Sequence, residues 1–270
     1  MDTQSMGAPL AGKRALIFGA GGAVGAAAAG EFAAQGATVF LAGRTLSRVE
    51  QVVEPLQERD LAAYGAQVDA LDEAAVEACL DRITGDGKAL DILLNVTGPQ
   101  ANEYGNATAT LDLPLEQYLL PLTTLVPAQF ITARAAARRM VRQGSGVILL
   151  ITAIPGRGSA ASAAIGSAFG AMESLVRCLA VDLGPSGVRV AGIRSGPMVD
   201  TRTIRQSFEN TARRLATTPE QVVAQAEART LLKSLPTAAD TARLAAFLAS
   251  DAARTVTGAI LNSTSGALLD

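Results

Sequence analysis

The sequence of 270 residues contains no histidine, which excludes the Ser-His-Asp and Cys-His arrangements of nucleophilic catalysis. Histidine is also the commonest transition-metal ligand, so we expect no bound metal. Only two cysteines are present, Cys79 and Cys178, and each lies among apolar neighbours in a segment of helical pattern. We expect both to be small core residues, with no disulfide and no thiol chemistry.

An excess of positive charge is also absent. The chain has 23 Lys and Arg residues against 25 Asp and Glu, which gives a formal net charge of -2. Such a chain offers no basic surface for nucleic acid, so no nucleic-acid partner is expected. Arg138, Arg139 and Arg142 do cluster, but their helical spacing beside a turn predicts a solvated helix end.

Long apolar runs are missing too. No run approaches the length of a membrane span, and residues 1–9 are too short and polar for a signal peptide. We therefore expect a cytoplasmic protein without a membrane partner, with residues 1–9 as a flexible tail. Hydrophobic residues make up 49% of the chain and aromatic residues only 4%, which predicts one tightly packed α/β domain over residues 1–270.

The segment from Arg14 to Gly25 runs from apolar residues of strand length into a glycine cluster that opens onto Ala-rich sequence. This order predicts a strand, a tight turn and a helix. Glycines permit unusual turn conformations and let a pyrophosphate approach the amides of a helix N-terminus. The residues expected to hold a dinucleotide here are Gly19, Gly21, Gly22, Val24 and Gly25. A purely structural turn is the alternative.

Arg44 follows a second apolar segment, residues 38–42. In NAD-specific folds an acidic residue at this place binds the adenine ribose, whereas a basic residue pairs with a 2′-phosphate. No Asp or Glu stands there. The sequence thus favours NADP(H) over NAD(H), the alternative being a surface arginine on a turn.

Strand-like and helix-like segments alternate along the rest of the chain. Further strands are predicted at residues 63–68, 90–95, 147–151, 188–193 and 259–262, and further helices at 47–59, 72 onward, 116–142, 163–183 and 238–250. The alternation predicts a Rossmann-type, doubly wound parallel sheet of about seven strands with helices on both faces. Pro55, Pro121 and Pro127 are expected to disturb their helices.

Two long segments follow predicted strands at the edge where such folds place ligands. Residues 99–115 form a loop rich in Asn, Thr and Gly, and residues 201–235 form polar helices that we expect to act as a substrate lid. We expect the pocket between them to be small, closed and apolar.

Several motifs lie at matching places along the chain. They are the turn from Phe18 to Gly25, the pair Asp69-Ala70, the run from Asn95 to Gly98, and Ser195-Gly196-Pro197. Together they resemble the short-chain dehydrogenase/reductase family across nearly the whole chain. The resemblance implies cofactor contacts at Asp69, Ala70, Asn95, Gly98, Gly196, Pro197 and Thr201, and a homodimer or homotetramer.

The catalytic residues of that family are not matched. Ordinary members use a Ser after the fifth strand and a Tyr and Lys spaced Y-x-x-x-K on the next helix. Here the Tyr position falls on Ile165, the Lys position on Phe169, and the Ser position on Thr152 or Ala153. The only lysines are Lys13, Lys88 and Lys233, and none is near this helix. The standard proton transfer is therefore absent.

Three residues are candidates for the remaining chemistry. Tyr104 is a candidate proton donor if its loop folds over the nicotinamide, the alternative being a partly exposed loop tyrosine. Thr152 is a candidate for holding a substrate carbonyl, or else it satisfies backbone groups at the strand end. Arg157 is a candidate for binding a substrate carboxylate, or else it faces solvent.

Three functions stay open at this point. The first is an NADPH-dependent reductase of a small carbonyl, alcohol or enoyl substrate with a non-standard proton donor. The second is a non-redox enzyme, such as an isomerase or cyclase, on the same scaffold. The third is a catalytically inactive nucleotide-binding or regulatory subunit.

Overall fold

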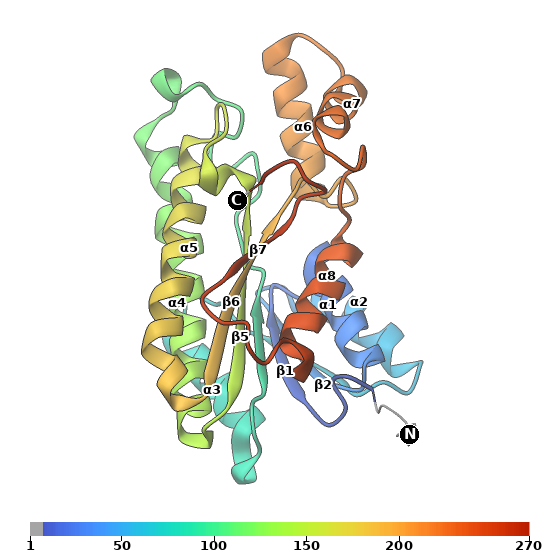
Figure 1. Cartoon of the computed structure of the whole chain (residues 1–270), viewed down its shortest axis with the longest axis vertical. Helices are drawn as coiled ribbons and strands as arrows, with labels where there is room; N and C mark the ends of the chain where they lie inside the picture. Colours follow the sequence, from blue (N-terminus) through green and yellow to red (C-terminus); the bar gives the residue numbers. More distant parts are fainter. Residues whose placement is uncertain (1–7, 270) are drawn as a thin grey trace.

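The computed structural model describes residues 8–269, and within them seven parallel strands form one sheet in the order β3-β2-β1-β4-β5-β6-β7 (Figure 1). The strands are β1 (Arg14–Phe18), β2 (Thr38–Gly43), β3 (Ala63–Gln67), β4 (Ile92–Asn95), β5 (Gly146–Ala153), β6 (Val188–Ser195) and β7 (Ile260–Ser263). The predicted doubly wound parallel sheet is confirmed. Most of the predicted N-terminal tail, residues 1–7, lies outside the described residues.

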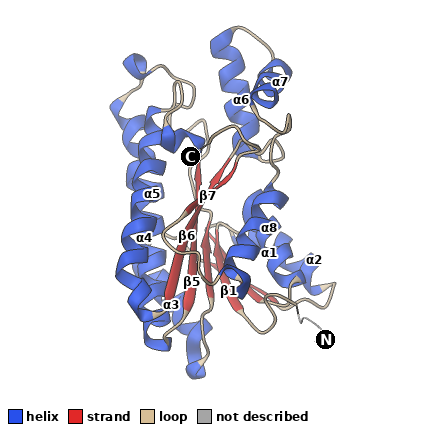
Figure 2. Cartoon of the chain, viewed as in Figure 1, coloured by secondary structure: helices blue, strands red, loops and turns tan. Residues whose placement is uncertain are grey.

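Helices cover both faces of the sheet (Figure 2). One face is covered by α3 (Glu73–Thr84), α4 (Leu115–Gln143) and α5 (Ala163–Leu183), and the other by α1 (Ala23–Ala34), α2 (Leu46–Gln57) and α8 (Ala238–Ala249). Successive side chains of a strand point to opposite faces. Leu16 of β1 therefore belongs to the first core and Ile17 to the second, which explains why the strand is apolar throughout.

The prolines disturb the long helix less than expected. α4 is assigned as one helix from Leu115 to Gln143 although Pro121 and Pro127 lie inside it. It ends at Gly144, which has a φ of 73° and supplies the left-handed conformation that closes the helix. α2 likewise continues to Gln57, two residues past Pro55.

The expectation that no segment is long and apolar enough to span a membrane was wrong. Residues Ala163–Ser186, which include α5, meet that criterion by length and composition. In the structure α5 packs against α4 on one side and against β5 and β6 on the other. A helix enclosed in this way is apolar over much of its surface, so α5 is a core helix of this fold.

In the arginine cluster of α4, Arg138 and Arg142 are exposed as predicted, but Arg139 is not. Arg139 is only 7% exposed, because α4 lies along α3 and this position faces the neighbouring helix. Its guanidinium donates to Glu77 Oε2 at 2.6 Å and to Asp81 Oδ1 at 2.5 Å. Arg139 thus joins two helices instead of ending one in solvent.

Only one of the two cysteines is a core residue. Cys79 of α3 is buried as predicted, but Cys178 is exposed. Both are free thiols. A helical position among apolar neighbours does not say which side of the helix meets the sheet, and Cys178 lies on the outer side of α5.

Two further helices stand above the carboxyl edge of the sheet, α6 (Arg202–Leu215) and α7 (Pro219–Arg229), within the predicted lid segment (Figure 1). Residues 99–114, between β4 and α4, rise on the other side of the same edge. The ends of β4, β5 and β6 therefore open between these two segments.

Candidate functional site

The glycine turn between β1 and α1 lies where the strand order reverses, since β1 pairs with β2 on one side and β4 on the other. Gly19 has a φ of +78°, and a Cβ added there would lie 2.9 Å from Thr97 N. A Cβ on Gly25 would lie 2.7 Å from Ala20 Cα. Both positions require glycine because neighbouring backbone atoms occupy the place of a side chain. The glycines therefore have a role in packing the turn.

The N-terminus of α1 is open to a ligand. Its N-cap, Gly22, has no side chain to satisfy the first-turn amides, and Gly21 and Gly22 are exposed while Val24 is partly buried. Uncapped amides at the positive end of a helix dipole attract anions. The turn therefore fits a pyrophosphate as well as serving the packing.

Two arginines stand beside this turn. Arg44 is exposed just after β2, and the carbonyl of Ala42 accepts hydrogen bonds from the amides of Gly19 and Ala20. Arg48 is exposed in the first turn of α2, where its Cβ lies 2.8 Å from a Cβ added to Gly21. Sequence reasoning missed Arg48, although its position four residues after Arg44 on a starting helix was an available signal.

Asp69 and Ala70 follow β3 at the same edge of the sheet. Asp69 is exposed, and its Oδ1 accepts a hydrogen bond from Leu71 N at 3.0 Å, which holds the carboxylate near the surface. Ala70 is buried in the core. The pairing of β3 with β2, and of β2 with β1, places the pair at the same edge of the sheet as the glycine turn.

Asn95 ends β4 and its side chain is fully buried. The Nδ2 atom donates to Thr132 Oγ1 of α4 at 2.7 Å, and Oδ1 accepts from Thr97 N at 2.9 Å and from Gln129 Nε2 at 3.1 Å. The side chain thus braces the segment that leads to the exposed Gly98. The amide of Asn95 is thus engaged by groups inside the protein.

The segment after β6 is similarly fixed from within. Gly196 donates its N–H to Ser263 O at 2.8 Å, and a Cβ there would lie 2.9 Å from Pro236 Cγ. Pro197 is partly buried. Thr201 is buried as the N-cap of α6, and its hydroxyl donates to Met198 O at 2.8 Å. The hydroxyl of Thr201 is therefore engaged inside the protein.

Ile165 and Phe169 pack into the protein at the positions that the resemblance assigns to Tyr and Lys. Ile165 is buried, and Phe169 packs against the same core. A short 3-10 turn, Ile154–Arg157, follows β5 and lies on α5, since a Cβ added to Gly156 would be 3.0 Å from Phe169 Cβ. The positions of Tyr and Lys in the resemblance are thus occupied by apolar side chains that pack under this turn. Arg157 is exposed at the end of the turn.

Tyr104 and Thr152 are both buried. Tyr104 is 6% exposed in the first core, and burial raises the pKa of its phenol to about 12. Thr152, at the end of β5, is fully buried, and its hydroxyl donates to Glu173 Oε1 at 3.4 Å. Tyr104 is therefore not the partly exposed loop residue of the alternative reading.

A buried ion pair lies beneath this region and was not found from the sequence. Arg194 of β6, 2% exposed, donates from Nε and Nη2 to the two carboxylate oxygens of Glu173 on α5, both at 2.8 Å. Its Nη1 donates to Asn262 Oδ1 at 2.8 Å. The register explains the group, because Arg194 is paired with Thr152 on one side and Asn262 on the other. Both carboxylate oxygens of Glu173 are therefore engaged by Arg194.

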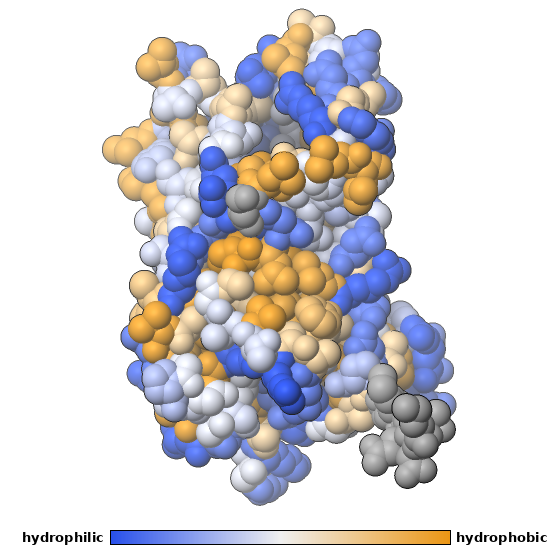
Figure 3. All heavy atoms as spheres, in the orientation of Figure 1, coloured by the Kyte–Doolittle hydropathy of each residue, from blue (hydrophilic) through white to orange (hydrophobic). Residues whose placement is uncertain are grey.

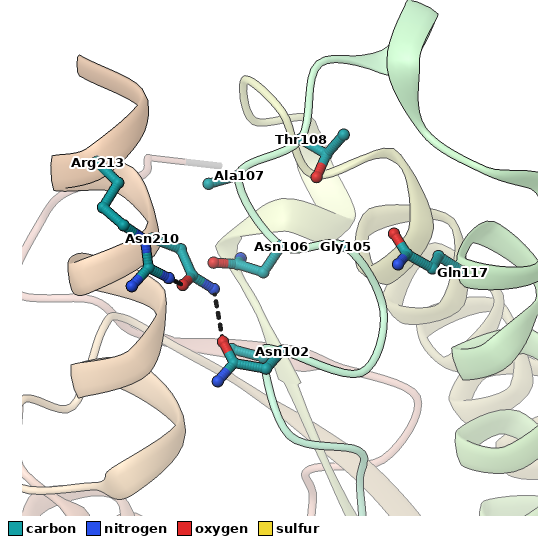
Figure 4. Close-up of a pocket in the computed structure, with 9 residues that line it drawn as sticks. Asn102, Gly105, Asn106, Ala107, Thr108, Gln117, Asn210 and Arg213 are labelled. Carbon is teal, nitrogen blue, oxygen red and sulfur yellow. Dashed lines mark hydrogen bonds between the residues drawn. The ribbon is translucent and has the colours of Figure 1, made fainter. Parts of the chain in front are cut away.

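A cavity of about 340 Å³ lies between the loop after β4 and α6 (Figure 4). Its lining is polar, which corrects the expectation of an apolar pocket. The lining residues are Ala101, Asn102, Gly105, Asn106, Ala107, Thr108, Gln117, Asn210 and Arg213. The long loop supplies most of these side chains, and its abundance of Asn was the signal that could have predicted a polar lining.

Comparison with known proteins identifies the family. Residues 19–267 match the family model described as Enoyl-(Acyl carrier protein) reductase. Cis-4-hydroxycyclohexanecarboxylate dehydrogenase of Sinomonas cyclohexanicum is 31% identical over 260 residues, which cover 95% of this chain and 96% of that protein. 7alpha-hydroxysteroid dehydrogenase of Escherichia coli (strain K12) is 29% identical over 258 residues, covering 95% and 94%.

Solved structures agree. A xylitol dehydrogenase with bound NAD+ matches this chain with a TM-score of 0.89 and 27% identity, covering 95% of this chain and 99% of that one. The chain therefore belongs to the short-chain dehydrogenase/reductase family of oxidoreductases. Members of this family bind NAD or NADP, act on small molecules and are typically oligomeric.

Proposed function

We propose that this protein is an NADP(H)-dependent oxidoreductase of a small carbonyl, alcohol or enoyl compound, with a proton donor other than the usual Tyr. The observation that carries the proposal is the exposed, uncapped glycine turn at the switch point of the sheet, flanked by Arg44 and Arg48. When bound, the nicotinamide would supply or accept the hydride. The residues of the chain bind and orient the nucleotide and the substrate.

The preference for the phosphorylated cofactor rests on charge at the end of β2. A 2′-phosphate carries negative charge that guanidinium groups recognise through paired hydrogen bonds. Arg44 follows β2 directly and Arg48 lies one helical turn further, whereas no carboxylate follows the strand before α2. An acidic residue there would repel the phosphate and bind a ribose hydroxyl instead.

Tyr104 is the proton donor that this proposal favours. Its loop follows β4 at the carboxyl edge of the sheet, and a pKa of about 12 keeps the phenol protonated at neutral pH. A phenol of this pKa transfers its proton only as strong negative charge develops on the substrate oxygen. Thr152 is fully buried against Glu173, so its proposed part is to position the end of β5.

A second function is favoured by one observation. The 3-10 turn after β5 packs directly on Phe169, so the Tyr and Lys positions are filled by apolar packing. A protein that binds the nucleotide but uses it for regulation, or for a non-redox reaction, would also show this arrangement.

The experiment that separates these functions combines binding with turnover. NADPH binding is measured by calorimetry, and NADPH oxidation is then followed at 340 nm with a panel of carbonyl compounds. The reductase predicts binding, stoichiometric oxidation, and a loss of kcat in Tyr104→Phe with unchanged NADPH affinity. Binding without oxidation of any panel member would favour the second function. Product formation without cofactor turnover would identify a non-redox enzyme.

A homodimer or homotetramer is part of the proposal, supported by apolar side chains at the surface. Phe130 of α4, Val181 of α5 and Phe247 of α8 are all exposed. Figure 3 shows apolar side chains gathered over the region where β7 and α8 lie. Contiguous apolar surface of this kind marks interaction sites. Sedimentation velocity is the test, and a monomer at all concentrations would contradict it.

We also propose a cytoplasmic location, which suits the two free thiols.

A further inference from the structure

The cavity between the loop after β4 and α6 is lined by segments that follow two strands of the sheet, and its loop is tied to a third. Its loop follows β4, and α6 follows β6. Ala107 N of the loop donates to Ala161 O at 3.2 Å, which ties the loop to the segment between β5 and α5. The cavity therefore lies over the carboxyl edge of β4, β5 and β6, the edge at which folds of this kind bind ligands.

The lining forms a connected set of hydrogen-bonding groups (Figure 4). Arg213 donates to Asn210 Oδ1, and Asn210 Nδ2 donates to Asn102 Oδ1 at 2.9 Å, so α6 is joined to the loop. A second hydrogen bond, from Thr203 Oγ1 to Gln100 Oε1 at 3.3 Å, joins the same two segments about two helical turns before Asn210. These bonds orient the amides before a ligand arrives.

Asn106 has an unsatisfied group in this cavity. Its Oδ1 is buried and has no hydrogen-bond partner within the described residues 8–269. Figure 4 shows the amide of Asn106 pointing from the loop toward α6. Buried acceptors in native proteins are nearly always satisfied, so a donor is missing here.

The lining of the cavity carries positive charge and no negative charge. Arg213 is the single charged residue among those that line the cavity, and no Asp or Glu is among them. The bond to Asn210 uses one of the five N–H groups of a guanidinium. The other polar side chains of the lining are four amides and one hydroxyl, groups that both donate to and accept from alcohol groups.

We propose that this cavity binds the substrate and that the substrate is a small polyhydroxylated anion, a sugar acid or a sugar phosphate. Hydroxyl groups of the ligand satisfy Asn106 and the other amides, and its carboxylate or phosphate pairs with Arg213. The cavity volume of about 340 Å³ suits a ligand at the small end of the usual range. This inference rests on the proposed oxidoreductase function, since it names the substrate class of that site.

The test is calorimetric titration of the protein, saturated with NADP+, with four matched compounds. D-Gluconate has hydroxyls and a carboxylate, sorbitol 6-phosphate has hydroxyls and a phosphate, sorbitol has hydroxyls alone, and hexanoate has a carboxylate alone. We expect one of the two polyhydroxylated anions to bind at least about tenfold more tightly than both sorbitol and hexanoate. Which anion binds decides between a sugar acid and a sugar phosphate.

Two variants assign the binding to the cavity. Arg213→Gln should weaken binding of the anion by about tenfold and bring it to the level of sorbitol. Arg214→Gln is the matched control, because Arg214 is the neighbouring exposed arginine on α6 and does not line the cavity, and it should leave binding unchanged. Asn106→Ala should weaken binding of the anion and of sorbitol together, since both lose the same hydroxyl contact.

Tighter binding of hexanoate than of either polyhydroxylated anion would overturn the inference, as would no binding of any of the four compounds. Equal effects of Arg213→Gln and Arg214→Gln would place the anion elsewhere. Titration with NADPH alone separates this failure from a failure of the proposed function. If NADPH does not bind, the oxidoreductase is wrong, and gluconate and sorbitol 6-phosphate are then titrated into the protein without cofactor to decide the cavity by itself.

Discussion

Single glycines set the geometry of the glycine turn between β1 and α1. A Cβ at Gly25 would collide with the carbonyl oxygen of Gly19 and approach Ala20 Cα to 2.7 Å. Gly30, one turn and a residue further along α1, has nothing within 4 Å of an added Cβ. The two positions lie on one helix but differ in whether a neighbour occupies the place of the side chain.

The substitution Gly25→Ala should lower the free energy of unfolding by about 1–3 kcal/mol and abolish measurable NADPH binding, because the turn must open to admit the methyl group. Gly30→Ala is its control and should raise stability by about 0.5–1 kcal/mol, as expected of alanine inside a helix. Urea unfolding and calorimetry check both. Normal NADPH binding by Gly25→Ala would contradict the assigned turn.

Tyr104 should ionise at a higher pH than an ordinary tyrosine side chain. Burial raises the pKa of its phenol to about 12, above the ordinary value of about 10. The unfolded chain therefore loses this proton first, and the stability due to the buried neutral phenol falls as pH rises from about 10 to 12. Absorbance at 295 nm should show one late ionisation that is missing in Tyr104→Phe. Equal titration curves for wild type and variant, apart from a scaled amplitude, would contradict the burial.

At the scale of elements, Glu77 joins α3 to α4. Burial raises the pKa of Glu77, but hydrogen bonds and charge from Arg139 and then Arg138 outweigh it, so the net pKa lies below its usual value. The stability from this group is therefore present above the ordinary carboxyl pKa of about 4.3 and is lost as pH falls through the lowered value.

Glu77→Gln should lower the free energy of unfolding at pH 7 by about 1–3 kcal/mol, because it removes one of the two carboxylates that pair with the buried guanidinium of Arg139 and leaves Asp81 as the other. Glu73→Gln removes a more exposed pair with Arg134 on the same helix and should cost less than about 1 kcal/mol. Denaturant curves at pH 7 and pH 3 measure both. The loss in Glu77→Gln should shrink at pH 3, and an equal loss at both values would contradict the ion pair.

The elements themselves were largely predictable from the sequence, because apolar runs, glycine turns and helix stops are local signals. The sequence of strands along the chain, and the helices that alternate with them, follow from these signals directly. Contacts between elements were not predictable in this way. Whether Arg139 meets α3 or water, and whether Cys178 meets the sheet, depends on how a helix is rotated about its axis, which the chain around each residue does not reveal.

The residues of the site show the same difference between local signals and contacts among distant elements. The glycine turn and Arg44 could be predicted because each signal is local: the turn lies between β1 and α1, and Arg44 directly follows β2. The group formed by Glu173, Arg194 and Asn262 was missed because its members come from α5, β6 and β7 and meet only through the strand register. The polar cavity was missed for the same reason, since its lining combines a loop after β4 with α6.

At the scale of the whole molecule, the carboxyl edge of the sheet presents two neighbouring regions. The glycine turn, where we propose that the nucleotide binds, follows β1 beside β4, and the polar cavity lies beyond β4 next to α6. The hydrogen bonds from Thr203 and Asn210 to the opposite loop connect the proposed lid to the body of the protein. Movement of α6 would break these bonds and open the cavity, which is how we expect the substrate to enter.

The lid contacts lead to a prediction about dynamics. Asn210→Ala removes the amide that joins α6 to Asn102 and leaves the sheet unchanged. Hydrogen exchange of α6 amides should become faster in this variant, while exchange in β4 and β5 should stay the same. Mass spectrometry of the exchanged peptides measures this. Unchanged exchange in α6 would mean that the contact does not hold the lid.

The measurement that tests the central claim most directly is calorimetric titration of the wild-type protein and of Arg44→Ala with NADPH and with NADH. We predict binding of NADPH at micromolar concentration, NADH binding about tenfold weaker or more, and loss of that preference in Arg44→Ala. Because the two nucleotides differ only in the 2′-phosphate, this comparison isolates the role of the arginine. No binding of either nucleotide, or equal binding of both by the wild-type protein, would contradict the account.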